Sequence, residues 1–359
     1  ASAPSSSATT STAAPSTGAR GTPSGPELVG TAGWINSEPL TIAGELSKNR
    51  AVLIDFWTYT CVNCIRTLPF VERWHERYGD HGLTVIGVHT PEFEFEHEHT
   101  NVEAAVRRYG LRYPVVQDNR YDTWDAFDNR FWPAKYLLVP ARGVVFSHFG
   151  EGKYQDTELA LRAELERLGY NLDGVPFTET AEPAIDAALT SQQTAELYGG
   201  YRHNYAGRGG AAGQDEYYLG PDQSQTYVDK GERASNRWYL QGEWLNEPEA
   251  ISHNRRTTAF EDYIALRFRA MSANVVLHPT GTQPLDVVVE LDGRPLLPTE
   301  AGQDVTPRAD GRSHMEVRDA RLYEVVRLPA FGEHELRLRS NSTDFAVYAF
   351  TFGSYEQGP

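Results

Sequence analysis

A short apolar run, AVLIDFW at residues 51–57, is followed within seven residues by the only two cysteines of the chain, Cys61 and Cys64. The run is rich in strand formers, and the segment after it, CIRTLPFVERWHERYGD at 64–80, has apolar residues at helical spacing. Pro69 lies inside that segment and should kink the helix. Any fold for this chain must therefore hold two thiols where a buried strand turns into a helix.

Three interpretations are open for this pair: half of a metal site, a redox couple, or an accident of sequence. A structural zinc site needs four Cys or His ligands, and no second C-x-x-C or H-x-x-x-H pair is present. The missing ligands would have to come from HTPEFEFEHEHT, which contains His89, His97 and His99. We interpret that stretch instead as the solvated lead-in to a helix at 101–110 and predict no metal.

The redox interpretation fits the position of the pair better. A C-x-x-C at a helix N-terminus directs its first sulfur toward unpaired backbone N–H groups and the positive end of the helix dipole. We therefore expect a lowered pKa for Cys61, in the range of roughly 3.5–7.5 for such thiols. Cys64, one turn inside the helix, would be shielded and would resolve the mixed disulfide. The sequence predicts a redox-active disulfide and no other cofactor.

The segment VLIDFWTYTCVNC, followed by Pro69, resembles the active site of the thioredoxin superfamily. The strand with Asp-Phe-Trp, which includes Trp57, the C-x-x-C and the helix-kinking proline all stand at that family's spacing. The resemblance implies an α/β thioredoxin-like fold and thiol-disulfide exchange by Cys61 and Cys64.

The same resemblance implies a cis proline that faces the disulfide just before a strand. The stretch RFWPAKYLLV supplies it as Pro133, preceded by Trp132, whose backbone would pair with a substrate strand. A trans proline at the start of a strand is the alternative.

Asp55 corresponds to the family's buried acid, which accepts the proton of the resolving thiol. Burial in an apolar strand should raise its pKa, although a structural, hydrogen-bonded acid is the alternative. Thioredoxin pairs this acid with a lysine on the next strand, but LTVIGVHT has Gly87 there, so we expect Asp55 to titrate differently. Val62 and Asn63 replace the Gly-Pro of thioredoxin, which leaves the direction of electron flow open.

The run from GVHTPEFEFE to FWPAKYLLV resembles the TlpA/redoxin branch and the extracytoplasmic part of actinobacterial DipZ-like proteins, over residues 27–359. Those proteins join a CcdA-like membrane electron carrier to a TlpA-like domain and a carbohydrate-binding-module-like β domain. RLYEVV and VYAFTFG are similar to that β domain. The resemblance implies an exported or tethered cell-envelope protein, protein thiol and disulfide substrates, a CcdA-like donor and a part in cytochrome c biogenesis.

The composition changes along the chain and predicts its organisation. Residues 1–26 are small and polar apart from Arg20 and should form a disordered linker, typical of a tether. Alternating strands and helices over 27–172 predict an α/β domain with a mixed sheet, and 173–200 a helical connector. Short alternating strands over 201–359 predict an all-β, jelly-roll-like sandwich.

Individual elements follow from periodicity and from turn residues. In the second half, EDYIALRFRA and NVVLHP, and likewise YEVVRLP and GEHELRLRS, are interpreted as separate short strands. In the first half, strands are expected at 83–90, 134–139 and 143–150, and helices at 101–110 and 156–169.

Two rival functions remain open. A redoxin-type peroxidase would have Pro-x-x-x-Thr-x-x-Cys, and Thr58 matches the threonine, but Ile54 stands where the proline should be. That mismatch and the nearby Cys64 favour disulfide exchange. The β domain could instead bind a cell-wall glycan by stacking sugars on aromatic rings of NRWYLQGEW, although such rings are usually core. The rings in question are Trp238, Tyr239 and Trp244.

The charge balance excludes some partners. Acidic residues outnumber basic ones 49 to 33, a formal net charge of −16, which argues against nucleic acid or an anionic membrane surface as the main partner. No apolar run reaches the ~18 residues of a membrane span. The first residue is not Met, so we expect a fragment or a processed form.

Overall fold

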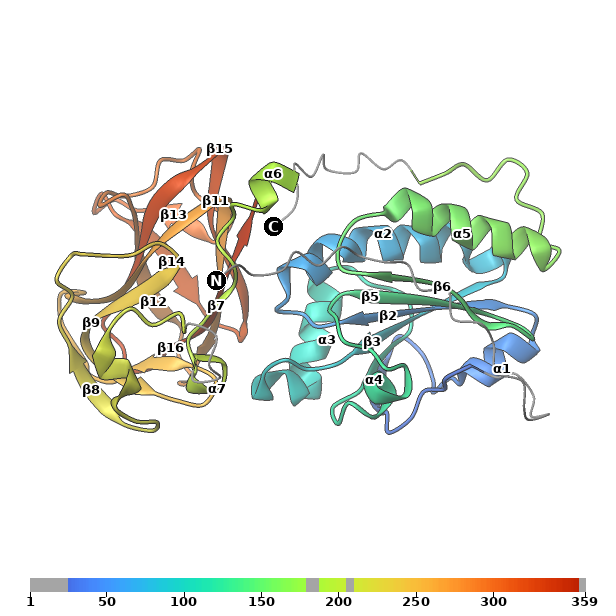
Figure 1. Cartoon of the computed structure of the whole chain (residues 1–359), viewed down its shortest axis with the longest axis horizontal. Helices are drawn as coiled ribbons and strands as arrows, with labels where there is room; N and C mark the ends of the chain where they lie inside the picture. The colour runs from blue at the N-terminus through green and yellow to red at the C-terminus, as the bar shows by residue number, and fades with distance from the viewer. Residues whose placement is uncertain (1–24, 179–186, 205–209, 355–359) are drawn as a thin grey trace, which may run out of the picture.

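The computed structural model describes residues 25–178, 187–204 and 210–354 of the chain. The predicted linker at 1–26 lies outside the described residues except for its last two. Figure 1 shows an α/β unit followed by a β-rich unit, as the sequence predicts. None of the helices in the described ranges combines the length and the apolar character that a membrane crossing requires.

The α/β unit is built on a six-stranded mixed sheet with the order β1-β4-β3-β2-β5-β6. Strands β2, β3 and β4 run parallel to one another, whereas β1 pairs antiparallel with β4, β5 with β2, and β6 with β5. The strands are β1 Ala32–Ile35, β2 Ala51–Trp57, β3 Leu83–His89, β4 Val115–Gln117, β5 Ala134–Val139 and β6 Gly143–Phe149. The helices are α1 Ile42–Ser47, α2 Val62–Tyr78, α3 His99–Arg108, α4 Asp122–Ala126 and α5 Tyr154–Arg167.

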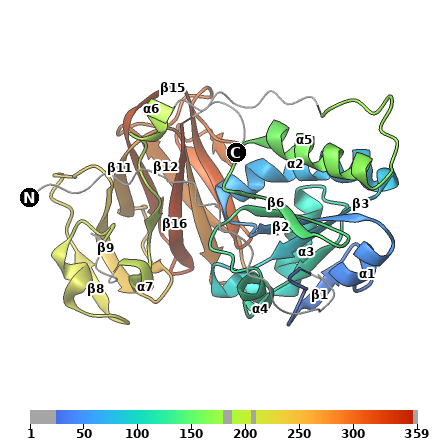
Figure 2. The same cartoon turned by 45° about the vertical axis from the view of Figure 1, so that its right-hand side comes forward.

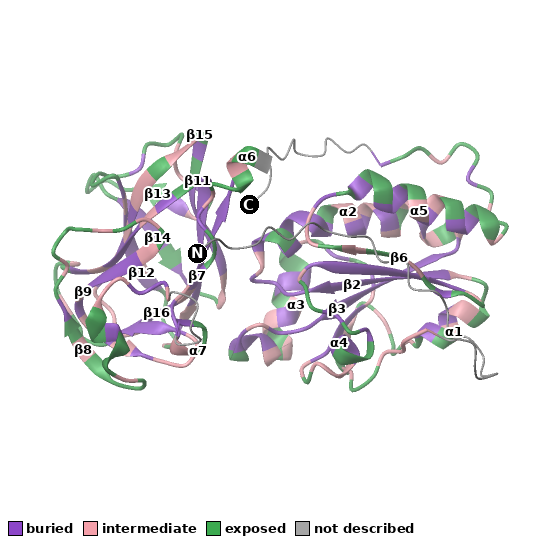
Figure 3. Cartoon of the chain, viewed as in Figure 1, coloured by how far each residue is buried: buried purple, intermediate pink, exposed green. Residues whose placement is uncertain are grey.

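Strand β2 lies in the middle of this sheet and is buried along its whole length (Figure 3). Successive side chains of a strand point to opposite faces. Leu53 and Trp57 therefore pack with α2, α3 and α5, whereas Ile54 and Phe56 pack with α1 and α4 on the other face. The same alternation puts Asp55 on the face that α2 covers.

The β-rich unit has one continuous sheet with the order β13-β14-β12-β15-β11-β16-β10-β9-β8, and β7 pairs with β16. Side chains from β9 and from β12 and β14, which stand far apart in this order, join one apolar core, so the sheet curls over on itself. Its elements are α6 Ala187–Thr190, β7 Leu197–Tyr198, α7 Tyr201–Asn204, β8 Ser224–Tyr227, β9 Arg237–Asn246, β10 Ile251–His253, β11 Asp262–Pro279, β12 Leu285–Leu291, β13 Val305–Pro307, β14 Ser313–Val317, β15 Arg321–Ser340 and β16 Phe345–Gly353.

The predictions differ from the structure mostly in the second half. Two pairs of segments that we expected to be separate strands are the single long strands β11 and β15, which pair with each other along their length. Register shifts between Ala270 and Ser272, and between Ala273 and Asn274, let this pairing continue past the expected breaks. In the first half the expected elements are present. The short elements β1, α1, β4 and α4 were not predicted, because each has too few residues for a periodic signal.

The two units share an apolar interface. Figure 2 shows β16 on the side of the β-rich unit that faces the α/β unit. Tyr348 of β16 makes edge contacts with Phe93 and Phe95, at ring-centroid distances of 5.2 and 4.9 Å. Ala349 and Leu322 belong to the same buried cluster as the side chains of α2. This interface fixes the β-rich unit next to the junction of β2 and α2.

Candidate active site

The two cysteines stand at the start of α2 with different exposure. Cys61 is the N-cap residue, and its Sγ accepts a hydrogen bond from the backbone N–H of Cys64 at 3.4 Å. Cys61 is half-buried, Cys64 is fully buried, and both are free thiols. Burial raises the pKa of Cys64 well above its usual range, and the hydrogen bond with Cys61 adds to the shift. Cys61 is therefore the sulfur that a substrate can reach.

Asp55 and Lys135 form a buried pair beneath the cysteines. They stand opposite each other in the antiparallel pairing of β2 and β5, with 4.0 Å between Lys135 Nζ and Asp55 Oδ1. Both side chains are fully buried. Loss of water raises the pKa of Asp55 to about 6, although Lys135 opposes the shift, and burial lowers the pKa of Lys135. Within the described ranges neither Asp55 oxygen accepts a hydrogen bond, which argues against a purely structural acid.

The lysine comes from β5 because β3 has no room for one. Gly87 is the β3 residue opposite Asp55. A Cβ atom at Gly87 would lie 2.9 Å from the ring of Tyr113 and 3.1 Å from Nε1 of Trp57. The cationic partner of Asp55 thus comes from β5 and not from β3. The sequence did carry a signal, since Lys135 is the only charge in the apolar strand AKYLLV.

A buried carboxylate orders the loop before the cysteines. Glu96 Oε1 accepts hydrogen bonds from the hydroxyls of Thr58 and Thr60, at 2.6 and 2.7 Å. Its other oxygen accepts the backbone N–H groups of Glu92 and Phe93. The stretch that links β2 to Cys61 is thus tied to the loop after β3, a role that the sequence did not reveal.

The other residues that were predicted to support the active site lie in different parts of the α/β unit. The Trp132–Pro133 peptide bond is cis, as expected, and Trp132 lines the same cleft as Cys61. Trp57 is buried, with its ring 5.2 Å from that of His89. Pro69 lies inside α2 and borders a separate hollow, next to Leu322 of the β-rich unit.

The histidines considered for zinc have other surroundings. His89 is buried against aromatic rings, and burial lowers its pKa to about 3. His97 contacts the carbonyl oxygens of Glu94 and Asn119, and His99 contacts the side chain of Gln117. In the parts of the chain that the structure describes, no three His, Cys, Asp or Glu side chains converge as a metal site.

The aromatic residues considered for sugar stacking point into the β-rich unit. Trp238 and Trp244 have no exposed surface, and their indole N–H groups donate to the carbonyl oxygens of Tyr198 and Gln241. These rings are therefore core, the alternative noted for them from the sequence, and offer no face to a sugar. Tyr239 is only 9% exposed, and its hydroxyl accepts the N–H of Ala234.

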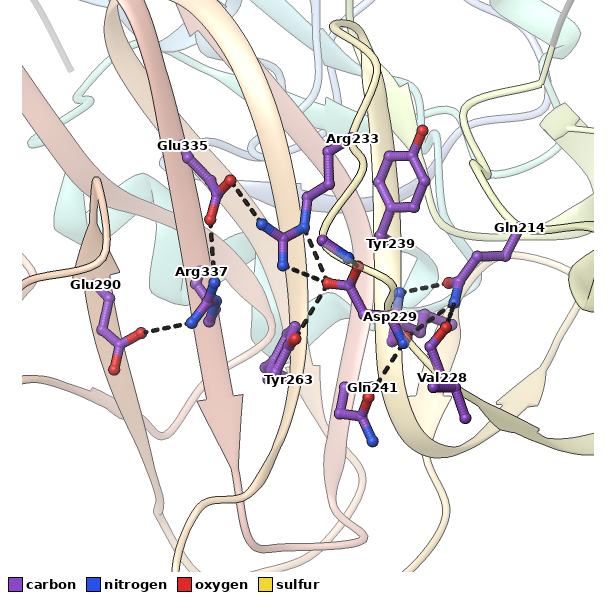
Figure 4. Close-up of polar contacts among 12 residues, drawn as sticks. Gln214, Val228, Asp229, Arg233, Tyr239, Gln241, Tyr263, Glu290, Glu335 and Arg337 are labelled. Carbon is purple, nitrogen blue, oxygen red and sulfur yellow. Dashed lines mark hydrogen bonds and ion pairs between the residues drawn. The ribbon is translucent and has the colours of Figure 1, made fainter.

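The charged side chains near Tyr239 pair with one another. Figure 4 shows Arg233 between Asp229 and Glu335, and Arg337 between Glu335 and Glu290. Asp229 also accepts the hydroxyl of Tyr263 at 3.1 Å. These internal pairs account for the charges of this group.

The β-rich unit supplies half of the cleft that opens at Cys61. This cleft has a volume of about 270 Å³ and is lined from both units. The α/β unit contributes the cysteine end of α2, Glu92 and Trp132, and the β-rich unit contributes the segment 193–196, Tyr198 and Phe352. These last groups could not be predicted from the sequence, because only the packing of the two units brings them to the sulfur.

Two family models match the chain. The Redoxin model matches residues 36–163, which include both cysteines and Pro133. A model described as "Thioredoxin like C-terminal domain" matches residues 194–353 of the β-rich unit. The matched ranges correspond to the two units of the structure.

Similar proteins are known from several bacteria. Protein DipZ of Mycobacterium tuberculosis is 32% identical over 335 residues, 91% of this chain and 42% of that protein, so the chain spans about two fifths of that relative. Thiol-disulfide oxidoreductase YkuV of Bacillus subtilis is 30% identical over 113 residues, 32% of this chain and 74% of YkuV. A solved thiol-disulfide isomerase of Corynebacterium glutamicum is 20% identical with a TM-score of 0.35, over 38% of this chain and 92% of that one.

Proposed function

Because this chain belongs to the thioredoxin-like thiol-disulfide oxidoreductases, we propose that Cys61 and Cys64 are its redox couple and that it reduces disulfides in other proteins. The observation that carries the proposal is the contrast between the two sulfurs. Cys61 opens into a cleft and Cys64 is buried one turn behind it, as an attacking and a resolving thiol require.

The reaction proceeds in two exchanges. The thiolate of Cys61 attacks one sulfur of the substrate disulfide, the substrate S–S bond breaks, and the released substrate sulfur takes up a proton. Cys64 then loses its proton and attacks Cys61 Sγ, which forms the Cys61–Cys64 disulfide and releases the second substrate sulfur. Two electrons pass from the enzyme dithiol to the substrate, which leaves as a dithiol.

Asp55 is the proposed proton acceptor in the second exchange. Burial holds the proton on Cys64, so a base close by is required before this thiol can attack. Asp55 interacts electrostatically with Cys64, and its pKa of about 6 leaves it mostly ionised at neutral pH. Lys135 is the proposed positioning residue, since its charge opposes the protonation of Asp55.

The finer assignments rest on the relatives. We propose that the protein works outside the cytoplasm and receives electrons from a CcdA-like membrane carrier. The support is the similarity to DipZ over 91% of this chain, together with the organisation of DipZ-like proteins. For the domain limits we propose 27–172 for the α/β unit and a β-rich unit that begins near residue 194 rather than 201, because β7 already pairs with β16.

The reduction potential of the couple tests the direction of electron flow. The proposed reduction of substrate disulfides requires a low reduction potential, whereas a couple whose reduced form is strongly stabilised is an oxidant. We expect equilibration with dithiothreitol buffers, followed by thiol labelling and mass analysis, to give one two-electron transition at about −270 mV, as in thioredoxin. A transition at about −120 mV would make the protein an oxidant and overturn the proposed direction.

A further inference from the structure

Two carboxyl groups meet at one phenol in the cleft of Cys61. Tyr198 Oη lies 2.6 Å from Glu92 Oε1 and 2.8 Å from Glu196 Oε2. Glu92 comes from the loop after β3, whereas Glu196 and Tyr198 come from the segment that begins the β-rich unit. All three side chains line the cleft into which Cys61 opens, so the group is part of the active site and spans both units.

The geometry sets the number of protons in this group. A phenol has one proton and donates it to one acceptor. Both short contacts are hydrogen bonds only if one of the two carboxyl groups carries a proton and donates it to the phenol oxygen. Two ionised carboxylates around one hydroxyl would leave one contact as a repulsion between lone pairs. The arrangement therefore holds one shared acidic proton beside the reactive sulfur.

We propose that Glu92 and Glu196, bridged by Tyr198, are the general acid that protonates the substrate sulfur released when Cys61 attacks. The inference deepens the proposed function and rests on it. When the substrate S–S bond breaks, the leaving sulfur takes the shared proton, and the carboxyl group becomes a carboxylate. The acid regains a proton from water before the next turnover, so no further reactant is required.

The surroundings of the pair favour retention of that proton. Burial raises the pKa of Glu92, and the charge of Glu196 adds to the shift. The surrounding protein also raises the pKa of Glu196, to about 6, although this side chain stays exposed to solvent. The other titratable groups that act on the pair are Cys61 and Glu96, which interact with Glu92, and His203, whose ring stacks on Tyr198 at 4.0 Å.

The acid lies in a cleft that the β-rich unit and the α/β unit form together around Cys61. A substrate disulfide that reaches Cys61 enters a cleft that is lined by Trp132, by the segment 193–196 and by Tyr198. The sulfur that leaves is therefore released within the cleft rather than into bulk water. A donor fixed in the lining of the cleft can protonate it there, which favours poor leaving groups most.

The test compares two neutral disulfides that differ in their leaving group, in a Cys64→Ser background that stops the reaction after the first exchange. Hydroxyethyl disulfide releases an alkyl thiolate that benefits from protonation, whereas dipyridyl disulfide releases a stabilised pyridinethione that leaves without a proton on sulfur. We expect the Glu92→Gln/Glu196→Gln double variant to react with hydroxyethyl disulfide about 100-fold more slowly, the lower range for a positioned general acid. Its rate with dipyridyl disulfide should stay within about twofold, as an acid effect requires.

The control is Glu94→Gln, which alters a solvent-exposed carboxyl group on the same loop and should leave both rates unchanged. Unaltered reaction with dipyridyl disulfide shows that the double variant is folded around Cys61. Equal slowing of both reactions, or no slowing of either, would overturn the acid role and leave the redox couple intact. Failure of the parent Cys64→Ser protein to react with either disulfide would instead contradict the proposed function.

Discussion

Replacing Cys61 by serine is expected to reduce the turnover of insulin disulfides to the uncatalysed rate, a fall of at least about 10³-fold for loss of a nucleophile. Cys61 is the sulfur at the mouth of the cleft, and the second thiol is buried behind it. A serine hydroxyl has a similar size but does not exchange with disulfides under these conditions. The turbidity of reduced insulin, followed with a limiting thiol donor, measures this effect.

The controls for this variant and a comparison of two substrates with the wild-type protein complete the test and address the peroxidase alternative. An unchanged unfolding transition serves as the control for folding, because serine conserves the shape of the N-cap. Wild-type protein should turn over protein disulfides faster than hydrogen peroxide, since the chain lacks the proline of the peroxidatic pattern. If Cys61→Ser still reduced insulin disulfides, Cys61 would not be the nucleophile.

Replacing Asp55 by asparagine is expected to increase the free energy of unfolding at pH 8 by about 3 kcal/mol, the equivalent of a pKa shift of about two units. The folded protein raises the pKa of Asp55 from 3.8 to about 6, so it binds more protons than the unfolded chain between these values. The free energy of unfolding therefore falls as the pH rises through this window, and the full loss has occurred above it. Asparagine removes the ionisation and its cost.

Urea unfolding of both proteins between pH 4 and pH 8 measures the difference, which should be small at pH 4 and largest at pH 8. The matched control is Asp80→Asn, which makes the same change at an exposed aspartate. The gain in stability should accompany slower resolution of mixed disulfides, because no carboxylate then accepts the proton of Cys64. Equal stability of Asp55→Asn and wild type across this range would contradict the energetic cost assigned to Asp55.

Local patterns predicted the part of the site that is continuous in the sequence. The apolar run of β2, the C-x-x-C and the helical spacing after it placed Cys61 and Cys64 at a strand-to-helix junction, and the structure has them there. This junction depends on residues within two adjacent elements, where periodicity carries the information. The cis bond before Pro133 was instead implied by the resemblance to the thioredoxin superfamily, and the structure has it.

The groups that sequence reasoning missed depend on pairing between distant segments. Lys135 faces Asp55 only because β5 is the antiparallel neighbour of β2, and the register between strands is not written in either strand alone. Tyr198 reaches Glu92 only because the β-rich unit packs against the loop after β3. The sugar-stacking hypothesis for Trp238 and Trp244 stayed open for the same reason, since the curl of the sheet that buries them cannot be seen in their local sequence.

Trapping of the mixed disulfide tests the central claim, attack by Cys61 and resolution by Cys64, most directly. The reduced Cys64→Ser protein is incubated with an oxidised protein substrate, and the cross-linked peptides are mapped by mass spectrometry. We expect a stable mixed disulfide through Cys61, absent from wild-type protein, where Cys64 releases it. If Cys61→Ser instead forms the adduct through Cys64, and Cys64→Ser forms none, the assignment of the two sulfurs is wrong.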